Sequence, residues 1–217
     1  MGTVYRGLDM QTQNPIAIKV LKGDLIQRDP ELIQRFRREG ETLRQLNHPN
    51  IVKMLGSEEK HGVNYLLMEY VGGGSLRDIL DDTPQLSIQR ALYIALDITD
   101  ALTRAHRLKV LHRDIKPSNI FVLPDGRIKI LDFGIAKLFG QGNEMTQTGT
   151  QIGTPIYMSP EQVKGEKSID HRSDIYSLGI TMFYAINGNH PYYLESDSQF
   201  EIFNKIIFDS LPDFNNG

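Results

Sequence analysis

The sequence predicts an α+β fold with two lobes, a small one rich in strands followed by a larger one rich in helices. Strand patterns and one amphipathic helix fill the first 71 of the 217 residues, and helical patterns dominate the rest. Between the two parts stands Gly72-Gly73-Gly74, which predicts a joint. Grouping strands at one end of the chain and helices at the other is typical of α+β proteins.

The first lobe is predicted to hold three strands and one helix. Residues 16–21 alternate between two faces, as a strand does. Residues 31–46 place apolar side chains at helical spacing, and the breaker cluster 47–50 ends that helix. Short strands are predicted over residues 51–55 and 64–70.

The second lobe is predicted to begin with a long helix over residues 88–107, capped by Ser87. Its apolar positions at helical spacing are Ile88, Leu92, Ala95, Ile98, Leu102 and Ala105.

Further along, two strands, a loop and a buried helix are predicted. Residues 120–123 and 127–131 read as strands joined by the turn Pro124-Asp125-Gly126. Residues 140–160 lack periodicity and predict a long loop. Residues 173–186 predict a buried helix that ends at Asn187-Gly188.

Composition excludes several classes of function. The chain has 40% hydrophobic and 24% charged residues, as an ordinary globular protein has. A formal net charge of −3 argues against a nucleic-acid partner. The absence of cysteine excludes disulfides and cysteine zinc sites and agrees with a cytoplasmic location. The sequence has no run of about 18 apolar residues, the length that a membrane-spanning helix needs, so no membrane contact by this segment is predicted.

The most informative motif is His112-Arg113-Asp114-Ile115-Lys116-Pro117-Ser118-Asn119. Asp132-Phe133-Gly134 and then Ser159-Pro160-Glu161 follow it, and Ala17-Ile18-Lys19 precedes it on a predicted strand. Each motif alone is weak. The ordered set resembles the signature of the protein kinase family, and Gly153-Thr154-Pro155 with Lys116 is similar to its serine/threonine branch.

The resemblance implies a bilobal protein-kinase fold, in which a small, mostly antiparallel β lobe with one key helix sits on a larger helical lobe. It implies transfer of the ATP γ-phosphate to protein Ser/Thr hydroxyls. Such chemistry requires positioning and charge neutralisation. Asp114 would receive the hydroxyl proton, and Lys116 would reach the transferring phosphate. Asn119 and Asp132 would hold Mg²⁺, or Mn²⁺, through the oxygen ligands that these ions prefer.

Lys19 would hold the α- and β-phosphates, steadied by a carboxylate of the predicted helix 31–46. Family spacing favours Glu39 for this partner, whereas charge alone leaves Glu31 and Glu41 open. The remaining nucleotide contacts implied by the resemblance are Gly2, Val4, Ala17, Leu76 and Phe121 around the base and phosphates, Met68 at the rear, and the backbone from Glu69 to Val71. Periodicity alone would assign the apolar members to the core.

Regulation is also implied by the resemblance. Arg113 before the catalytic aspartate goes with control by loop phosphorylation. Thr146, Thr148 and Thr150 lie between Asp132 and Glu161, and Thr146 and Thr148 are the favoured autophosphorylation sites. The alternative is that these are solvated threonines with no role. Asp174 resembles the aspartate that anchors the catalytic loop, although a charge favouring a helix N-terminus explains it equally well. Glu161 pairs with a late arginine in the family.

Met145-Thr146-Gln147-Thr148 followed by Ile152-Gly153-Thr154 resembles the bacterial receptor-type serine/threonine kinases. The resemblance to the family breaks off at both ends. Residues 1–71 would form the N-terminal lobe without its first strand and most of the glycine-rich loop. Residues 72–217 would form the C-terminal lobe without its last helices. Two accounts stay open: an excerpt of a longer kinase, such as the cytosolic part of a membrane receptor, or a shortened chain with impaired catalysis.

Two other functions are weighed against the kinase. An inactive kinase-fold module that binds nucleotide or acts as a scaffold would usually lack one of Lys19, Asp114 and Asp132, and all three are present. A small-molecule phosphotransferase would lack the segment Gly153–Glu161. The predicted partners are protein substrates and a second copy of the chain for autophosphorylation in trans.

Overall fold

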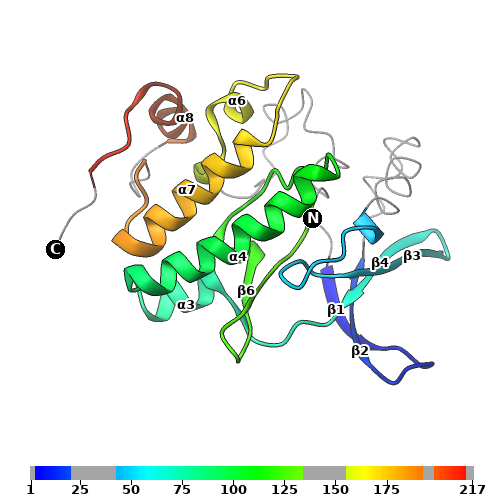
Figure 1. Ribbon diagram of the computed structural model, residues 1–217. Coiled ribbons are helices and arrows are strands. Elements are labelled where there is room, and N and C mark those ends of the chain that lie inside the picture. Colours follow the sequence, from blue (N-terminus) through cyan, green and yellow to red (C-terminus); the bar gives the residue numbers. More distant parts are fainter. Residues whose placement is uncertain (1–2, 21–42, 134–154, 193–197, 214–217) are drawn as a thin grey trace.

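The computed structural model describes residues 3–20, 43–133, 155–192 and 198–213. Strands gather at one end of the molecule and helices at the other (Figure 1). Predicted site residues Gly2, Glu39, Thr146, Thr148 and Thr154 lie outside the described residues, as does most of the predicted helix 31–46.

The N-terminal lobe holds a four-stranded antiparallel sheet. Its strands are β1 (Thr3–Leu8), β2 (Pro15–Val20), β3 (Met54–Lys60) and β4 (Val63–Glu69), in the order β1-β2-β4-β3. His61 and Gly62 join β3 to β4 with φ of 53° and 74°, the left-handed pair that a type I′ hairpin turn needs. Sequence analysis did not predict β1 as a strand.

The strand predicted over residues 51–55 is wrong in its bounds. β3 begins at Met54 and continues to Lys60. Ile51 instead forms an isolated parallel bridge with Ile130, far along the chain. The Val52 N–H donates to the Ile130 carbonyl at 2.9 Å, and the Ile130 N–H donates to the Asn50 carbonyl at 2.8 Å. The backbone at 50–52 is therefore paired with the second lobe, which local pattern does not reveal.

The C-terminal lobe contains a small three-stranded sheet, in the order β5-β6-β7, beside several helices. The strands are β5 (Gly74–Ser75), β6 (Ile120–Val122) and β7 (Ile128–Ile130). The turn predicted between the last two is confirmed, with the Leu123 N–H donating to the Arg127 carbonyl at 2.9 Å. β5 includes Gly74, so part of the predicted joint is paired with Val122 of β6.

Five α-helices and two short 3₁₀ segments are described in this lobe. They are α3 (Leu76–Asp82), α4 (Ile88–Arg107), α6 (Pro160–Val163), α7 (Arg172–Asn187), α8 (Gln199–Phe208), η1 (Pro117–Asn119) and η2 (Pro155–Tyr157). In Figure 1, α4 and α7 run side by side through its centre. Among the described helices, none combines the length and apolar character that crossing a bilayer requires. The predicted loop 140–160 is described only from residue 155, where η2 begins.

Helix α4 has the predicted bounds and cap, with the Arg90 N–H donating to Ser87 Oγ at 3.2 Å. The predicted buried face is partly wrong, because Ile88 and Leu92 are 65% and 57% exposed. Apolar residues occur on more than one side of this helix, so spacing alone could not choose the face that packs. The residues that are buried are Ala91, Ile94, Ile98, Ala101, Leu102 and Ala105.

Helix α7 confirms the predicted buried helix and its end. Gly188 follows it with φ 75°, and its N–H donates to the Tyr184 carbonyl at 2.9 Å, a left-handed C-terminal cap. The helix buries polar as well as apolar residues. Ser173, Asp174, Ser177 and Thr181 are all nearly inaccessible and all hydrogen-bonded. Such a helix is suited to anchor neighbouring loops.

One apolar core runs through both lobes. It joins Leu66 of β4 to Leu76 of α3, Ile98 of α4 and Ile130 of β7. Leu43 and Leu46, at the end of the predicted helix 31–46, are buried in the same core. The division at residue 71 therefore stays a prediction about folding units, since the described side chains pack continuously across it.

Gly73 is expected to tolerate no side chain. Its φ is 107°, and a Cβ there would lie 2.2 Å from the Val122 carbonyl oxygen, whereas a Cβ on Gly72 would meet open space. We expect Gly73→Ala to lower the free energy of unfolding by about 2 kcal/mol or more, since both strain and overlap must be relieved. Urea unfolding of both variants checks this. Equal, small losses in Gly73→Ala and Gly72→Ala would contradict it.

A second, smaller apolar cluster lies beside His190. The ring meets Tyr157 edge-on at 5.3 Å, and the buried Nε2 has no hydrogen-bond partner among the described residues. The cluster consists of Ile156, Tyr157, Ile180, Tyr192, Ile202 and Ile206. Burial lowers the pKa of His190 from 6.5 to about 4. The folded protein therefore holds this imidazole neutral where the unfolded chain would protonate it.

This histidine predicts an acid-sensitive stability. Because its pKa is depressed on folding, its contribution is fully present above pH 6.5 and is lost as the pH falls toward 4, by up to about 3 kcal/mol. Chemical unfolding of the wild type and of His190→Phe between pH 7 and 4.5 measures this. The variant should show a shallower decline. His61→Asn, on an exposed turn, is the control, and a slope unchanged in His190→Phe would refute the prediction.

Candidate active site

Strand β2 carries Lys19 into a buried position facing the second lobe. The residue is 4% exposed, and its Nζ lies 2.7 Å from Asp132 Oδ2. Asp132 follows β7 and has φ 60°, an uncommon left-handed conformation for a residue with a side chain. The ion pair therefore joins the N-terminal sheet to the segment that leaves β7, between residues 113 positions apart.

Asp114 lies in a second group of polar side chains. Lys116 Nζ lies 2.8 Å from Asp114 Oδ2. Asn119 Nδ2 donates to the Asp114 carbonyl at 2.7 Å and to Asp114 Oδ2 at 3.0 Å. The 3₁₀ segment η1 brings Asn119 back toward Asp114 across five positions. Lys116 and Asn119 thus fix the orientation of this carboxylate.

His112 connects this loop to the segment that carries Asp132. Its Nε2 lies 2.7 Å from the Leu131 carbonyl, which can only accept, so Nε2 carries the proton. Its Nδ1 then accepts from the Asp114 N–H at 3.2 Å. The Leu131 N–H in turn donates to the Asn119 carbonyl at 2.9 Å. The structure therefore brings Lys19, Asp114, Asn119 and Asp132 into one hydrogen-bonded region. In the sequence analysis only the motif around His112 was noted, not these bonds.

The Asp174 carboxylate, at the start of α7, accepts three hydrogen bonds, two of them from the backbone of the loop that carries Asp114. It accepts from the His112 N–H at 2.9 Å, the Arg113 N–H at 2.7 Å and His106 Nε2 at 2.7 Å. Burial opposes its ionisation, but the hydrogen bonds led by His106 outweigh burial and lower its pKa. His106 was not predicted, since its contact spans 68 positions of sequence.

Arg113 and Glu161, which lie on different elements, both bond to residues at the start of α7. Arg113 has φ 67°, and its carbonyl accepts from Gln162 Nε2 at 2.9 Å. Glu161 of α6 accepts a hydrogen bond from Ser173 Oγ. Ser173 is thus the partner that the described residues supply for Glu161, in place of the arginine implied by the resemblance. Gln162 was not singled out from the sequence.

Several predicted base-contacting residues lie on the sheet. Val4 of β1 stands opposite Lys19 in register, and Ala17 of β2 stands opposite Met68 of β4. The Val4 side chain is 56% exposed and is therefore accessible to a ligand. Phe121 lies on β6, in the other sheet, and is partly buried. Val4, Ala17 and Met68 lie on the strand that carries Lys19 or on its two neighbours in the sheet.

Two other predicted contacts have roles within the fold. Leu76 is 0% exposed and packs in the core, so it offers no surface to a base. Glu69 uses its side chain inside the protein: Oε1 accepts from the Lys53 N–H at 2.8 Å and from Lys129 Nζ at 2.6 Å. Val71, two residues on, lies in the connection to the second lobe and is partly buried.

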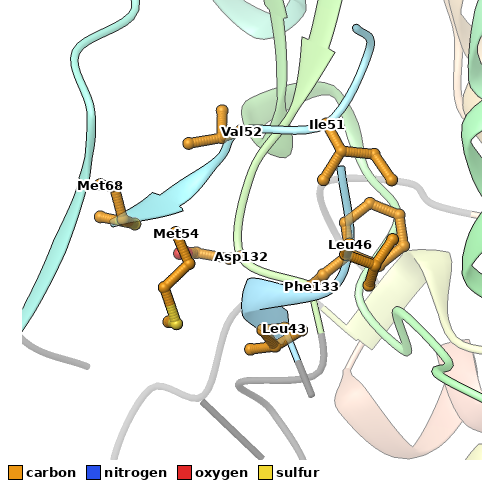
Figure 2. A pocket seen from close by; sticks show the side chains of 8 residues that line it. All are labelled: Leu43, Leu46, Ile51, Val52, Met54, Met68, Asp132 and Phe133. Carbon is orange, nitrogen blue, oxygen red and sulfur yellow. The ribbon is translucent and has the colours of Figure 1, made fainter. Parts of the chain in front are cut away.

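An apolar pocket lies behind Asp132. Figure 2 shows Asp132 between the methionines 54 and 68 on one side and Leu46 and Phe133 on the other. Leu43, Ile51 and Val52 complete the lining. Phe133 also meets the ring of His112 edge-on at 4.6 Å. Apolar walls beside the Asp132 carboxylate lower the local dielectric constant, which strengthens the Coulomb attraction between Asp132 and Lys19.

Comparison with known proteins identifies the family. A family model described as protein kinase domain matches residues 1–213. The chain belongs to the protein kinase family. This confirms the resemblance drawn from the motifs and the α+β kinase fold, since the antiparallel sheet and the helical lobe are both present.

Three curated relatives of this protein kinase domain come from bacteria. The serine/threonine-protein kinase PknB of Mycolicibacterium smegmatis is 41% identical over 197 residues, covering 88% of this chain and 31% of the relative. PknB of Mycobacterium leprae is 39% identical over 196 residues, with the same coverage. PknA of Mycobacterium tuberculosis is 40% identical over 197 residues, covering 88% of this chain and 45% of the relative. The chain thus spans about a third of the length of the PknB relatives.

Proposed function

We propose that this chain transfers the γ-phosphate of ATP to serine and threonine hydroxyls of proteins. The observation that carries the proposal is the juxtaposition of two charged groups of side chains, Lys19 with Asp132 and Asp114 with Lys116 and Asn119. Phosphoryl transfer needs cations and oriented carboxylates around a phosphate more than it needs covalent chemistry. The names of the relatives support the serine/threonine class.

Asp114 is the proposed catalytic base. The substrate hydroxyl oxygen would bond to the γ-phosphorus as the bond from that phosphorus to the β–γ bridging oxygen breaks, and its proton would pass to the Asp114 carboxylate, with ADP leaving. Asn119 and Lys116 hold that carboxylate in one orientation. Lys116, already within 2.8 Å of Asp114, is placed to stabilise negative charge on the phosphate.

The residues present fit a hard divalent cation. Asn119 directs its Nδ2 toward Asp114, which leaves Oδ1 as the oxygen that a ligand could use. Asp132 supplies a carboxylate. Mg²⁺ prefers oxygen ligands and keeps several waters, so Asn119 and Asp132 suffice as protein ligands for Mg²⁺ or Mn²⁺. When bound, the cation would neutralise phosphate charge.

The nucleotide would lie between the two lobes. Lys19, released in part from Asp132, would pair with the α- and β-phosphates. The base would contact Val4, Ala17 and Phe121, with Met68 behind it and the backbone of residues 69–71 hydrogen-bonding its edge. Gly2 and Glu39 belong to this proposal from the sequence alone.

Regulation and partners are extensions of the same proposal. Thr146 and Thr148 are the proposed autophosphorylation sites, with a second copy of the chain acting in trans. Thr154 belongs to the same proposed regulatory segment. Arg113 is the proposed partner of the phosphothreonine. Protein substrates and a cytoplasmic location complete the proposal, and the absence of cysteine agrees with that location.

Two measurements test the function. Labelled ATP with matched peptides carrying Ser, Thr or Tyr at one position should give phosphate on the first two only. Thermal unfolding with and without Mg-ATP reports binding independently. Stabilisation by Mg-ATP without transfer to any peptide would replace the proposal by a nucleotide-binding module. Absence of both effects would reject nucleotide chemistry altogether.

A further inference from the structure

The side-chain amide of Gln162 joins the short helix α6 to the catalytic loop. Its Nε2 donates to the Arg113 carbonyl at 2.9 Å, and its Oε1 accepts from the Ser159 N–H at 3.0 Å. A carbonyl only accepts and an N–H only donates, so these two partners fix which way the amide points. The residue is 6% exposed, so water does not readily replace either bond.

The peptide that Gln162 holds is strained and leads directly into Asp114. Arg113 has φ 67°. This conformation is unfavourable in free energy for any residue with a side chain, and it persists only where surrounding contacts fix it. Its N–H is held by Asp174 at 2.7 Å and its carbonyl by Gln162. The N–H at the other end of that peptide, on Asp114, donates to His112 at 3.2 Å. Without Gln162, the carbonyl end of this peptide would lose its described side-chain donor.

The hydrogen bond from Gln162 to Arg113 is distinct from the capping of α6, as the other capped helices show. α3 and α8 also begin with a capping box, and their third helical residues are the carboxylates Asp78 and Glu201. A carboxylate accepts the cap N–H as well as an amide does. α6 has Gln162 at this position, and an amide can in addition donate to Arg113. The cap alone does not require an amide, whereas the bond to Arg113 does.

We propose that Gln162 is a positioning residue for phosphoryl transfer, which sets the orientation of Asp114 through the Arg113 carbonyl. The proposal rests on the proposed function, because it assumes that Asp114 acts on the substrate hydroxyl. It also links the segment 155–163, which follows the predicted loop threonines, to the geometry of the catalytic loop.

Gln162→Glu isolates the contact, because the new side chain keeps the capping acceptor and, when ionised, has no donor for Arg113. We expect kcat to fall about 10- to 100-fold with KM for ATP nearly unchanged, as misplacing a catalytic group by about 1 Å does. Hydrogen exchange of the backbone amides at 112–114 should become faster. Gln85→Glu is the matched control: it makes the same exchange where Gln85 Nε2 donates to the Asn187 carbonyl at 3.0 Å, and it should leave kcat unchanged.

The pH profile distinguishes positioning from a loss of packing. A protonated carboxyl can donate to the Arg113 carbonyl and an ionised one cannot. The activity of Gln162→Glu relative to wild type should therefore fall as the pH rises from 6 to 9, while that of Gln85→Glu stays level. Gln162→Met, which removes both bonds without adding charge, should lose kcat at every pH and guards against misfolding of the charged variant.

Wild-type kcat in Gln162→Glu across this range, with unchanged exchange at 112–114, would overturn the proposal. So would an equal loss in Gln85→Glu. If the wild type transfers no phosphate, the exchange measurement still decides whether Gln162 holds the loop. Failure of the proposed function and failure of this inference therefore give different results.

Discussion

Asp114→Asn should reduce kcat for phosphate transfer at least about 10³-fold while leaving nucleotide binding nearly intact. A positioned general base contributes about 10² to 10⁴ to a rate, and an amide cannot take the hydroxyl proton. The substitution also removes the charge that pairs with Lys116 at 2.8 Å. Initial rates with labelled ATP measure the first effect, and thermal stabilisation by Mg-ATP measures the second.

The control is a carboxylate remote from the site. Asp82, the exposed last residue of α3, can be changed to Asn with no expected effect on the rate. A rate of Asp114→Asn within tenfold of wild type would mean that the hydroxyl proton leaves by another path. Loss of Mg-ATP stabilisation in that variant would instead place Asp114 among the binding residues.

Asp174→Asn should lower the free energy of unfolding by about 3 to 5 kcal/mol and remove most activity. The carboxylate is 1% exposed and accepts three hydrogen bonds, from His106 and from the backbone of His112 and Arg113. An amide would turn a donor toward donors, and removing one partner of a buried charged network typically costs this much. Urea unfolding and the rate of phosphate transfer measure the two losses.

Acid should reproduce part of this loss in the wild type. The pKa of Asp174 is lowered from 3.8 on folding, so its contribution is present above that pH and is lost as the pH falls through its folded value. Asp170→Asn is the control, because the exposed Asp170 carboxylate has only Arg172 as its hydrogen-bond partner among the described residues, and its loss should leave the free energy of unfolding nearly unchanged. Equal destabilisation by the two variants would contradict the anchoring role.

The sequence predicted correctly the caps, turns and helix ends that depend on residues close to one another in the chain. The cap at Ser87, the turn at Asp125-Gly126 and the end of α7 at Gly188 each depend on residues within a few positions of one another. The bounds of β3 were missed because Asn50 to Val52 pair with β7, about 78 positions away. The packed face of α4 was missed because burial depends on which neighbour covers a helix, not on its spacing alone.

The same distinction holds for the site. Motif order alone was enough to predict that Lys19, Asp114, Asn119 and Asp132 converge, and the structure brings them together. It did not predict the buried bonds of His106 and Gln162, because neither residue stands in a motif that requires them. Contacts made by a single side chain across 49 to 68 positions leave no periodic signal in one sequence.

The parallel bridge between Ile51 and Ile130 has a mechanical consequence for the relative motion of the two lobes. Hydrogen bonds on both sides of Ile130 tie residues 50–52 to the strand that ends just before Asp132. These two backbone hydrogen bonds resist sliding of the two segments past each other but permit a slight rotation of one segment about the other. If the N-terminal sheet rotates relative to the helices, the axis of rotation should therefore lie beside Asp132, and the strands farthest from this bridge should move the most.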